Sequence, residues 1–135
     1  MAKTILIADD FADDATRLEH ALKDSGLNNP IVTVSDGDEV LAYLRGEGRF
    51  SDRTVFPVPT VLLLDLKMRR VSGFEVLKWL QSNPEFKDVL VVVISGYHEL
   101  KDVNLAYQLG ARSFITKPCR TEDIKQLTTA FAGHW

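Results

Sequence analysis

Four of the short apolar runs in this sequence are each followed by polar side chains of types found in reactive sites. Asp9 and Asp10 come directly after the first run, and Asp65 follows the third. Ser95 ends the fourth run, and Lys117 follows the fifth. In a parallel sheet, ligands bind outside the carboxyl ends of the strands. If the first and third runs are neighbours in such a sheet, three carboxylates and one ammonium group converge at one edge.

Crowded carboxylates repel one another, so a site of this kind needs a cation. Mg2+ suits it, because Mg2+ prefers oxygen ligands and is usually held by one or two carboxylates together with a phosphate. Asp65 would then attack phosphorus and form an aspartyl phosphate, while Mg2+ and Lys117 neutralise the phosphoryl oxygens. Ser95 would supply a hydroxyl donor to the same oxygens. The residue types therefore point to phosphoryl transfer onto Asp65.

Each of these features taken alone has a simpler explanation. An aspartate pair after a strand is often a helix N-cap that interacts with the helix dipole. A serine followed by glycine, as at Ser95, is most often a turn, and Lys117-Pro118 alone is typical of an extended surface dipeptide. Together they favour a reactive site, because they lie at the same end of different predicted strands.

Alternating apolar runs and amphipathic stretches predict the elements that position these residues, in the pattern typical of βαβ units around a parallel sheet. The predicted strands are Thr4–Ala8, Ile31–Val34, Thr60–Leu64, Val89–Ile94 and Ser113–Thr116. The predicted helices contain Ala15–Leu22, Val40–Leu44, Phe74–Leu80, Leu100–Leu109 and Thr121–Phe131, the last with Thr121 as its N-cap. The third and fourth strands have apolar interiors and suit the centre, whereas the second and fifth are mixed and suit the edges. One connection, from Glu47 to Pro59, is longer than usual and is a candidate functional segment.

The composition restricts the classes of partner. The 135 residues, 45% of them hydrophobic, are enough for one domain. Sixteen Lys and Arg against nineteen Asp and Glu give a net charge of −3, which disfavours charge-driven binding to nucleic acid or anionic membranes. The single Cys119 excludes an internal disulfide, and the N-terminus has neither a signal-peptide core nor a membrane span. We therefore expect a cytoplasmic protein with neither nucleic acid nor a membrane as partner.

At this point the motifs match a known family: the chain resembles the CheY-like receiver domain of two-component response regulators over essentially its whole length. The residues that carry the resemblance are Asp9-Asp10, Asp65, Gly73, Ser95 and Lys117-Pro118. The resemblance implies an α/β, flavodoxin-like (βα)5 three-layer sandwich with a five-stranded parallel sheet of order 2-1-3-4-5. It also implies that the whole chain, 1–135, is a single receiver domain with no output domain.

The same resemblance implies roles for individual residues. A histidine kinase would phosphorylate Asp65, with Mg2+ held by Asp10, Asp65 and the backbone carbonyl of Lys67, and Asp9 in support. Lys117 would complete the catalytic set with Asp65 and Ser95, and its following peptide bond would be cis at Pro118. The protein would be no enzyme beyond its own phosphorylation and dephosphorylation.

The resemblance further implies a switch. Ser95 would move toward the phosphoryl group and Phe114 would turn inward, which reshapes the fourth helix, fifth strand and fifth helix. Output would be a downstream protein, a phosphotransfer partner or a homodimer formed through that face. The loop 46–53 is similar to that of the small stand-alone receivers that serve bacterial phytochromes, so a phytochrome-type sensor histidine kinase is the expected partner.

The chain departs from the family pattern at several positions. Arg69 stands where many relatives have proline, between Lys67 and Arg70. A solvated basic loop is the favoured interpretation, and electrostatic steering of an acidic partner is the alternative. Phe114 replaces the commoner tyrosine, so burial of the ring can report the switch but a hydroxyl bond cannot. Lys67 and Tyr97 occupy positions that tune hydrolysis in the family.

Other functions compete with the receiver. An aspartate-nucleophile phosphatase usually needs a second acid two residues after the nucleophile, where this chain has Lys67. A flavodoxin-like cofactor binder needs a phosphate-cradling loop after the first strand, where Asp9 and Asp10 place negative charge. A pseudo-receiver or scaffold that works without phosphorylation stays open, although the intact acidic set makes it the minority interpretation.

Overall fold

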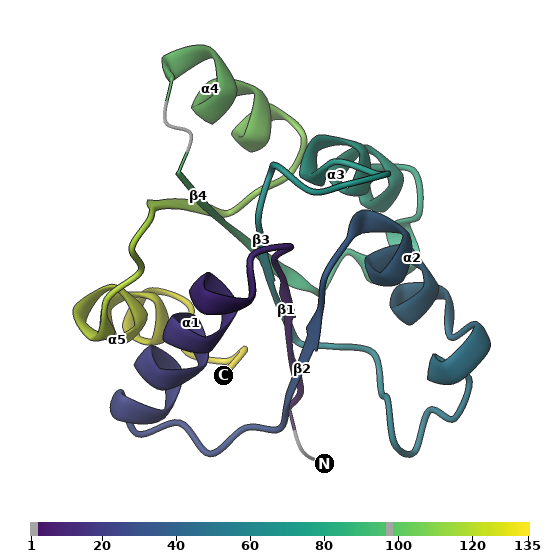
Figure 1. Ribbon diagram of the computed structural model, residues 1–135, viewed down its shortest axis with the longest axis horizontal. Helices are drawn as coiled ribbons and strands as arrows, with labels where there is room; N and C mark the ends of the chain where they lie inside the picture. Colours follow the sequence, from purple (N-terminus) through teal and green to yellow (C-terminus); the bar gives the residue numbers. More distant parts are fainter. Residues whose placement is uncertain (1–2, 97–98) are drawn as a thin grey trace.

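The protein is an α/β sandwich, seen in a computed structural model that describes residues 3–96 and 99–135 (Figure 1). Tyr97 and the adjacent His98 lie outside the described residues. The strands are β1 (Ile5–Ala8), β2 (Ile31–Val34), β3 (Val61–Leu64), β4 (Leu90–Ser95) and β5 (Ser113–Thr116). The α-helices are α1 (Ala12–Asp24), α2 (Gly37–Arg45), α3 (Gly73–Gln81), α4 (Leu100–Gln108) and α5 (Thr121–Ala130). Short 3-10 turns, η1 (Gly48–Phe50) and η2 (Pro84–Phe86), precede β3 and β4.

The five strands form one parallel sheet in the order β2-β1-β3-β4-β5, which confirms the predicted fold class. Helices α1 and α5 cover one face, and α2, α3 and α4 cover the other (Figure 1). Alternate strand residues therefore enter different cores. On β1, Ile5 and Ile7 pack toward α1 and α5, whereas Leu6 and Ala8 pack toward α2 and α3.

Burial follows the predicted strand positions. Every residue of β3 and β4 is buried, as expected of central strands covered on both faces. The strands β2 and β5 are only partly buried and lie at the two edges. In the part of the chain that the structure describes, no helix is long and apolar enough to cross a bilayer.

Helix ends mostly match the sequence signals. Helix α2 ends at Gly46, which has the left-handed φ of 68° that glycine tolerates best. Helix α3 begins with a capping box between Ser72 and Glu75. The prediction of Thr121 as an N-cap is wrong by one residue. Arg120 is the N-cap residue of α5. Its backbone N–H donates to the carboxylate of Asp123, three residues later, over 2.9 Å.

The long connection after α2 closes back onto that helix. The Arg53 guanidinium donates to the carbonyl oxygens of Tyr43 and Leu44 in the last turn of α2, and to that of Phe56. The bonds to Tyr43 and Leu44 add a donor at carbonyls in the last turn of α2, where intrahelical partners run out. The rings of Tyr43, Phe50 and Phe56 also pack together in tilted and edge-to-face pairs, with ring centroids 5.0 to 5.9 Å apart. The connection therefore has a structural role in which Arg53 caps α2 and aromatic rings extend the core.

Candidate functional site

The carboxyl ends of β1 and β3 bring the predicted acidic residues together. Ala8 pairs with Leu64 in the sheet register, and the N–H of Asp65 donates to the Ala8 carbonyl over 2.9 Å. Asp9, Asp10 and Asp65 each place one carboxylate oxygen within 4.8 Å of the others. Asp9 and Asp65 are buried, whereas Asp10 is partly exposed. The three carboxylates thus form an oxygen-rich cluster that solvent reaches at Asp10.

Lys117 reaches the same cluster from the end of β5. The backbone N–H of Lys117 donates to the Ser95 carbonyl over 2.9 Å, which continues the pairing of β5 with β4. Its Nζ lies 2.9 Å from Oδ2 of Asp9 and 3.2 Å from Oδ2 of Asp65. A third carboxylate, Oδ2 of Asp14, lies 2.9 Å from the same nitrogen. The structure therefore joins the predicted lysine to two predicted acids and to one that the sequence analysis missed.

The electrostatics of the site keep Asp65 easy to protonate when metal is absent. Burial raises the pKa of the Asp65 carboxyl from 3.8 to about 6, against the opposing charge of Lys117 and with support from Asp9. Burial disfavours the charged form of Lys117, but hydrogen bonds to Asp9 and Asp14 and the charge of Asp65 raise the pKa of Lys117 above 10.5. The lysine is therefore protonated at neutral pH, and a bound cation would favour ionised Asp65 as well.

The loop between β3 and α3 folds back against Asp65. Gly73 opens α3, and its N–H donates to the Leu66 carbonyl over 2.9 Å. A Cβ on Gly73 would lie 2.3 Å from the Asp65 carbonyl oxygen, so a larger residue would push the loop away. The N–H of Lys67 donates to Oδ1 of Asp65 over 3.3 Å. Gly73 thus allows the loop that carries Lys67 to stay close to the Asp65 carboxylate.

The two predicted switch residues lie on adjacent strands. Ser95 is the last residue of β4 and is fully buried. Phe114 lies on β5 opposite Val93, is half-buried, and packs against the core under α2, α3 and α4. The peptide bond between Lys117 and Pro118 is cis. The structure therefore places Ser95 at the edge of the sheet where the carboxylates lie, and it places the Phe114 ring on the neighbouring strand β5.

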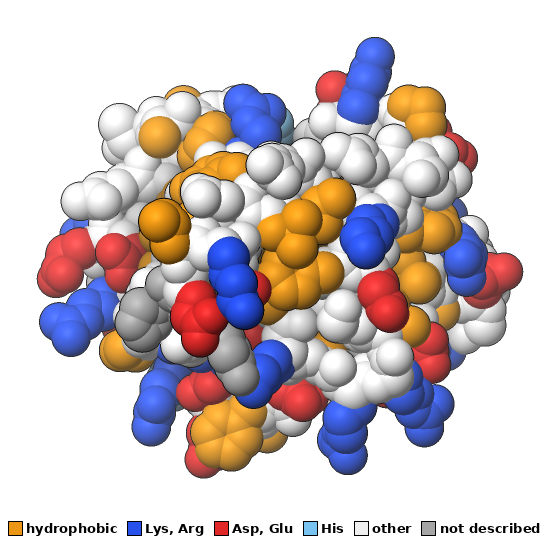
Figure 2. Space-filling view, turned by 90° about the horizontal axis from the view of Figure 1, so that it is seen from above, with side chains coloured by type: hydrophobic (Ala, Val, Ile, Leu, Met, Phe, Trp, Pro, Cys, Tyr) orange, Lys and Arg blue, Asp and Glu red, His pale blue; other side chains and the backbone are white. Residues whose placement is uncertain are grey.

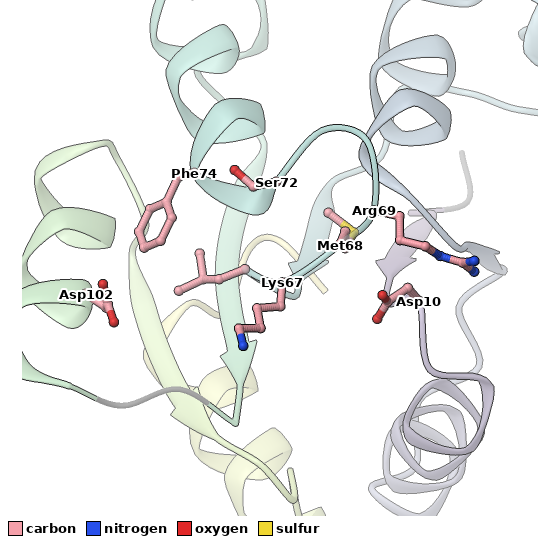
Figure 3. Close-up of a pocket in the computed structure, with 8 residues that line it drawn as sticks. Asp10, Lys67, Met68, Arg69, Ser72, Phe74 and Asp102 are labelled. Carbon is pink, nitrogen blue, oxygen red and sulfur yellow. The ribbon is translucent and has the colours of Figure 1, made fainter.

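A pocket of about 480 Å3 opens beside the carboxylate cluster (Figure 3). Lys67 extends between Asp10 on one side and Phe74 and Asp102 on the other (Figure 3). Viewed from above, where the strands end, hydrophobic side chains gather near the middle of the face with charged side chains around them (Figure 2). The remaining residues that line the pocket are Leu66, Met68, Arg69 and Ser72. A reagent or partner group that approaches Asp10 would therefore meet both apolar and charged side chains.

The basic loop between β3 and α3 is exposed, which both interpretations of it allow. Lys67, Arg69 and Arg70 are all exposed. Arg70 adopts a left-handed φ of 68°, and its guanidinium lies 3.9 Å from Oδ2 of Asp36 and 3.8 Å from Oδ2 of Asp38. Arg70 therefore pairs with the start of α2, while Lys67 and Arg69 line the pocket.

Strand-end reasoning missed Asp14, the third carboxylate that contacts the Lys117 ammonium. That reasoning considers residues at the ends of strands, whereas Asp14 lies in the first turn of α1. A usable signal existed, because Asp14 is four residues after Asp10 and a helix entering at this edge keeps its first turn near the site. The pocket residues Phe74 and Asp102 were missed for the same reason, since they come from α3 and α4.

The protein has a CheY-like flavodoxin fold, and an acidic cluster and a lysine lie together at the carboxyl edge of its sheet. Residues 5–129 match the family model of the response regulator receiver domain. Response regulator Rcp1 of Synechocystis sp. is 29% identical over 133 residues, which cover 98% of this chain and 88% of that protein. The chain belongs to the response regulator receiver domain family and is a two-component response regulator domain.

Solved structures support the same assignment. The bacteriophytochrome response regulator RtBRR superposes with a TM-score of 0.88 and 33% identity, covering 100% of this chain and 81% of that one. The phosphorylated cyanobacterial phytochrome response regulator RcpA gives a TM-score of 0.82 and 32% identity over 100% of this chain and 94% of that one. The Mn2+-bound form of Rcp1 gives a TM-score of 0.80 and 28% identity, covering 98% of this chain and 94% of that one. The similarity to response regulators named for phytochromes agrees with the loop resemblance found in the sequence.

Proposed function

We propose that Asp65 accepts a phosphoryl group from a sensor histidine kinase. The observation that carries the proposal is the buried Asp65 carboxylate, with the Lys117 ammonium 3.2 Å away and two further carboxylates within 4.8 Å. An oxygen of Asp65 attacks phosphorus, a P–O bond forms, and the bond between phosphorus and the kinase imidazole nitrogen breaks, with its electron pair going to that nitrogen. Lys117 donates hydrogen bonds to the oxygens on which negative charge develops.

The cluster suits a divalent cation, and we propose Mg2+. Receiver domains bind divalent metal, and the solved form of Rcp1 contains Mn2+. All side-chain donors here are carboxylate oxygens, from Asp9, Asp10 and Asp65, and the backbone carbonyl of Lys67 belongs to the proposed set. Such hard oxygen donors match Mg2+. Bound Mg2+ would supply positive charge to the transferring phosphoryl group.

We further propose that the signal leaves through protein binding. Ser95 donates to the new phosphoryl group and Phe114 turns inward, which changes the face formed by α4, β5 and α5. Helix α4 already exposes Leu105 by 37% and Tyr107 by 46%, and β5 is an edge strand. A downstream protein, a phosphotransfer partner or a second copy of the chain would bind there. This output is non-enzymatic, and the chain's catalytic role is limited to its own phosphorylation and dephosphorylation.

A phytochrome-type sensor kinase is the proposed phosphodonor. The support is similarity to RtBRR and RcpA, which are named as phytochrome response regulators. Receiver domains accept phosphoryl groups from histidine kinases, and we propose that this transfer takes place in the cytoplasm. Residues 1–135 would work as one receiver unit.

The test is incubation with acetyl phosphate and Mg2+, followed by intact-mass measurement of wild type and Asp65→Asn. The proposal expects a phosphoryl-sized mass gain in the wild type and none in Asp65→Asn. A gain that persists in Asp65→Asn would place the phosphoryl group elsewhere. No gain in a folded, Mg2+-loaded wild type would instead favour the phosphorylation-independent scaffold, and release of phosphate from a small phosphate ester would favour the phosphatase.

A further inference from the structure

The Lys117 ammonium has a carboxylate partner for each of its three N–H donors. Its nitrogen lies 2.9 Å from Asp9, 2.9 Å from Asp14 and 3.2 Å from Asp65. A lysine ammonium has three donors and no more. The contact with Asp65 is the longest of the three, so Asp9 and Asp14 hold the ammonium slightly more closely than the phosphorylation site does.

Asp14 lies outside the cluster of carboxylates that suits a cation. It stands in the first turn of α1, with 23% of its side chain exposed, and its other oxygen, Oδ1, lies 3.8 Å from the exposed Arg17 guanidinium. The neighbouring residue Asp13 carries the same charge and lies in the same turn of α1, but its side chain is exposed. Asp14 is therefore the acid of this turn that contacts the reactive lysine.

We propose that Asp14 is a positioning residue that competes with the incoming phosphoryl group for the Lys117 ammonium and thereby slows phosphorylation of Asp65. The inference rests on the proposed function of Asp65. Charge that builds on the phosphoryl oxygens in the transition state needs a donor from Lys117. With all three donors bound to carboxylates, Lys117 must first release one of them. Asp14 also adds a negative charge beside a site that receives an anionic phosphodonor.

Phosphorylation kinetics of Asp14→Asn test this competition. The rate constant is measured by intact mass with acetyl phosphate at saturating Mg2+, for the wild type, Asp14→Asn and the matched control Asp13→Asn. We expect Asp14→Asn to react roughly two- to five-fold faster, the size of effect given by one partly exposed ion pair. Asp13→Asn should react at the wild-type rate, and Asp14→Glu should stay closer to wild type than Asp14→Asn.

A double-mutant cycle shows whether Asp14 acts through the lysine. In a Lys117→Ala background, Asp14→Asn should leave the slow rate unchanged within about two-fold, because the group through which it acts is gone. A rate gain as large as in the wild-type background would overturn the positioning role and leave only a general effect of charge. Binding of beryllofluoride, a phosphoryl mimic, gives a second reading of the same cycle and needs no chemical step.

The outcomes separate this inference from the proposed function. If Asp65→Asn is inert, the wild type is phosphorylated and Asp14→Asn reacts at the wild-type rate or more slowly, the inference is wrong and the function stands. If the wild type, Asp14→Asn and Asp13→Asn all stay unphosphorylated while folded, the proposed function fails first. Thermal unfolding of each variant verifies that the rates belong to folded protein.

Discussion

The Nζ atom of Lys117 lies 3.2 Å from Oδ2 of Asp65, although 52 positions separate the two residues in the sequence. The contact exists because β3 and β5 flank β4 on its two sides and all three strands end at the same edge. A cation and a buried carboxylate are thus brought together by strand order alone. This pair lies beside Asp9 and Asp10 at the carboxyl edge of the sheet.

Replacing Asp65 by Asn should stabilise the metal-free protein. The pKa of Asp65 is about 6 in the folded state against 3.8 ordinarily, so the folded protein binds this proton more tightly. The contribution of the Asp65 carboxyl to the free energy of unfolding therefore falls as pH rises from about 4 to about 6. We expect Asp65→Asn to gain up to about 3 kcal/mol at pH 7.5. Urea unfolding in EDTA measures this gain.

The same experiment has a pH control and a matched variant. The gain should shrink as pH falls and approach zero at about pH 3, where Asp65 is mostly protonated in both the folded and the unfolded state. The exposed Asp88→Asn should change the free energy of unfolding by less than about 0.5 kcal/mol. A gain for Asp65→Asn that does not vary with pH would contradict the raised pKa.

Removing the exposed member of the cluster should weaken metal binding. Asp10→Ala takes away one carboxylate of the three while leaving buried Asp9 and Asp65 in place. We expect the Kd for Mg2+ to rise at least about ten-fold, or about 1.4 kcal/mol, measured by isothermal titration calorimetry. Asp102→Ala, which removes an acid from the same pocket but not from the cluster, should bind nearly as wild type. Equal losses in the two variants would argue against the proposed ligands.

A methyl group at Gly73 should disturb the loop that carries Lys67. The new Cβ would lie 2.3 Å from the Asp65 carbonyl oxygen and 2.7 Å from Cα of Leu66, distances that require backbone movement. We expect Gly73→Ala to cost about 1–3 kcal/mol in the free energy of unfolding and to slow phosphorylation. Gly133→Ala, where a Cβ meets nothing within 4 Å, should be neutral in both measurements. Wild-type stability in Gly73→Ala would show that the loop accommodates the methyl group.

The connection after α2 should depend on Arg53. Arg53→Met removes the donors to the Tyr43, Leu44 and Phe56 carbonyls, so we expect a loss of about 2–4 kcal/mol in chemical denaturation. Arg49→Met, in the same connection, loses an exposed ion pair with Glu39 and should cost less than about 1 kcal/mol. Similar losses for both variants would remove the capping role of Arg53.

The sequence was sufficient to predict the fold and the residues at the strand ends. Periodicity separated strands from helices, and the apolar interiors of β3 and β4 placed them at the centre. The sequence also predicted that four strand-end residues lie close together, because parallel strands end at one edge of the sheet. These residues are Asp9, Asp10, Asp65 and Lys117.

Contacts made by helices and loops were harder to foresee. Asp14 reaches Lys117 across 103 positions, and that contact depends on how α1 leaves the end of β1. Arg53 finds the last turn of α2 through a connection whose path no periodicity describes. The pairing of Arg70 with Asp36 likewise joins the loop after β3 to the start of α2, although β1 lies between β2 and β3 in the sheet. Side-chain reach across separate segments, rather than secondary structure, was the missing information.

The most direct test of the central claim locates the phosphoryl group chemically. Wild-type protein treated with acetyl phosphate and Mg2+ is reduced with borohydride, which converts an aspartyl phosphate to homoserine, and its peptides are sequenced by mass spectrometry. Our account predicts homoserine at position 65 and unmodified aspartate at positions 9, 10 and 14. Homoserine at another position, or none in protein that has gained phosphoryl mass, would contradict it.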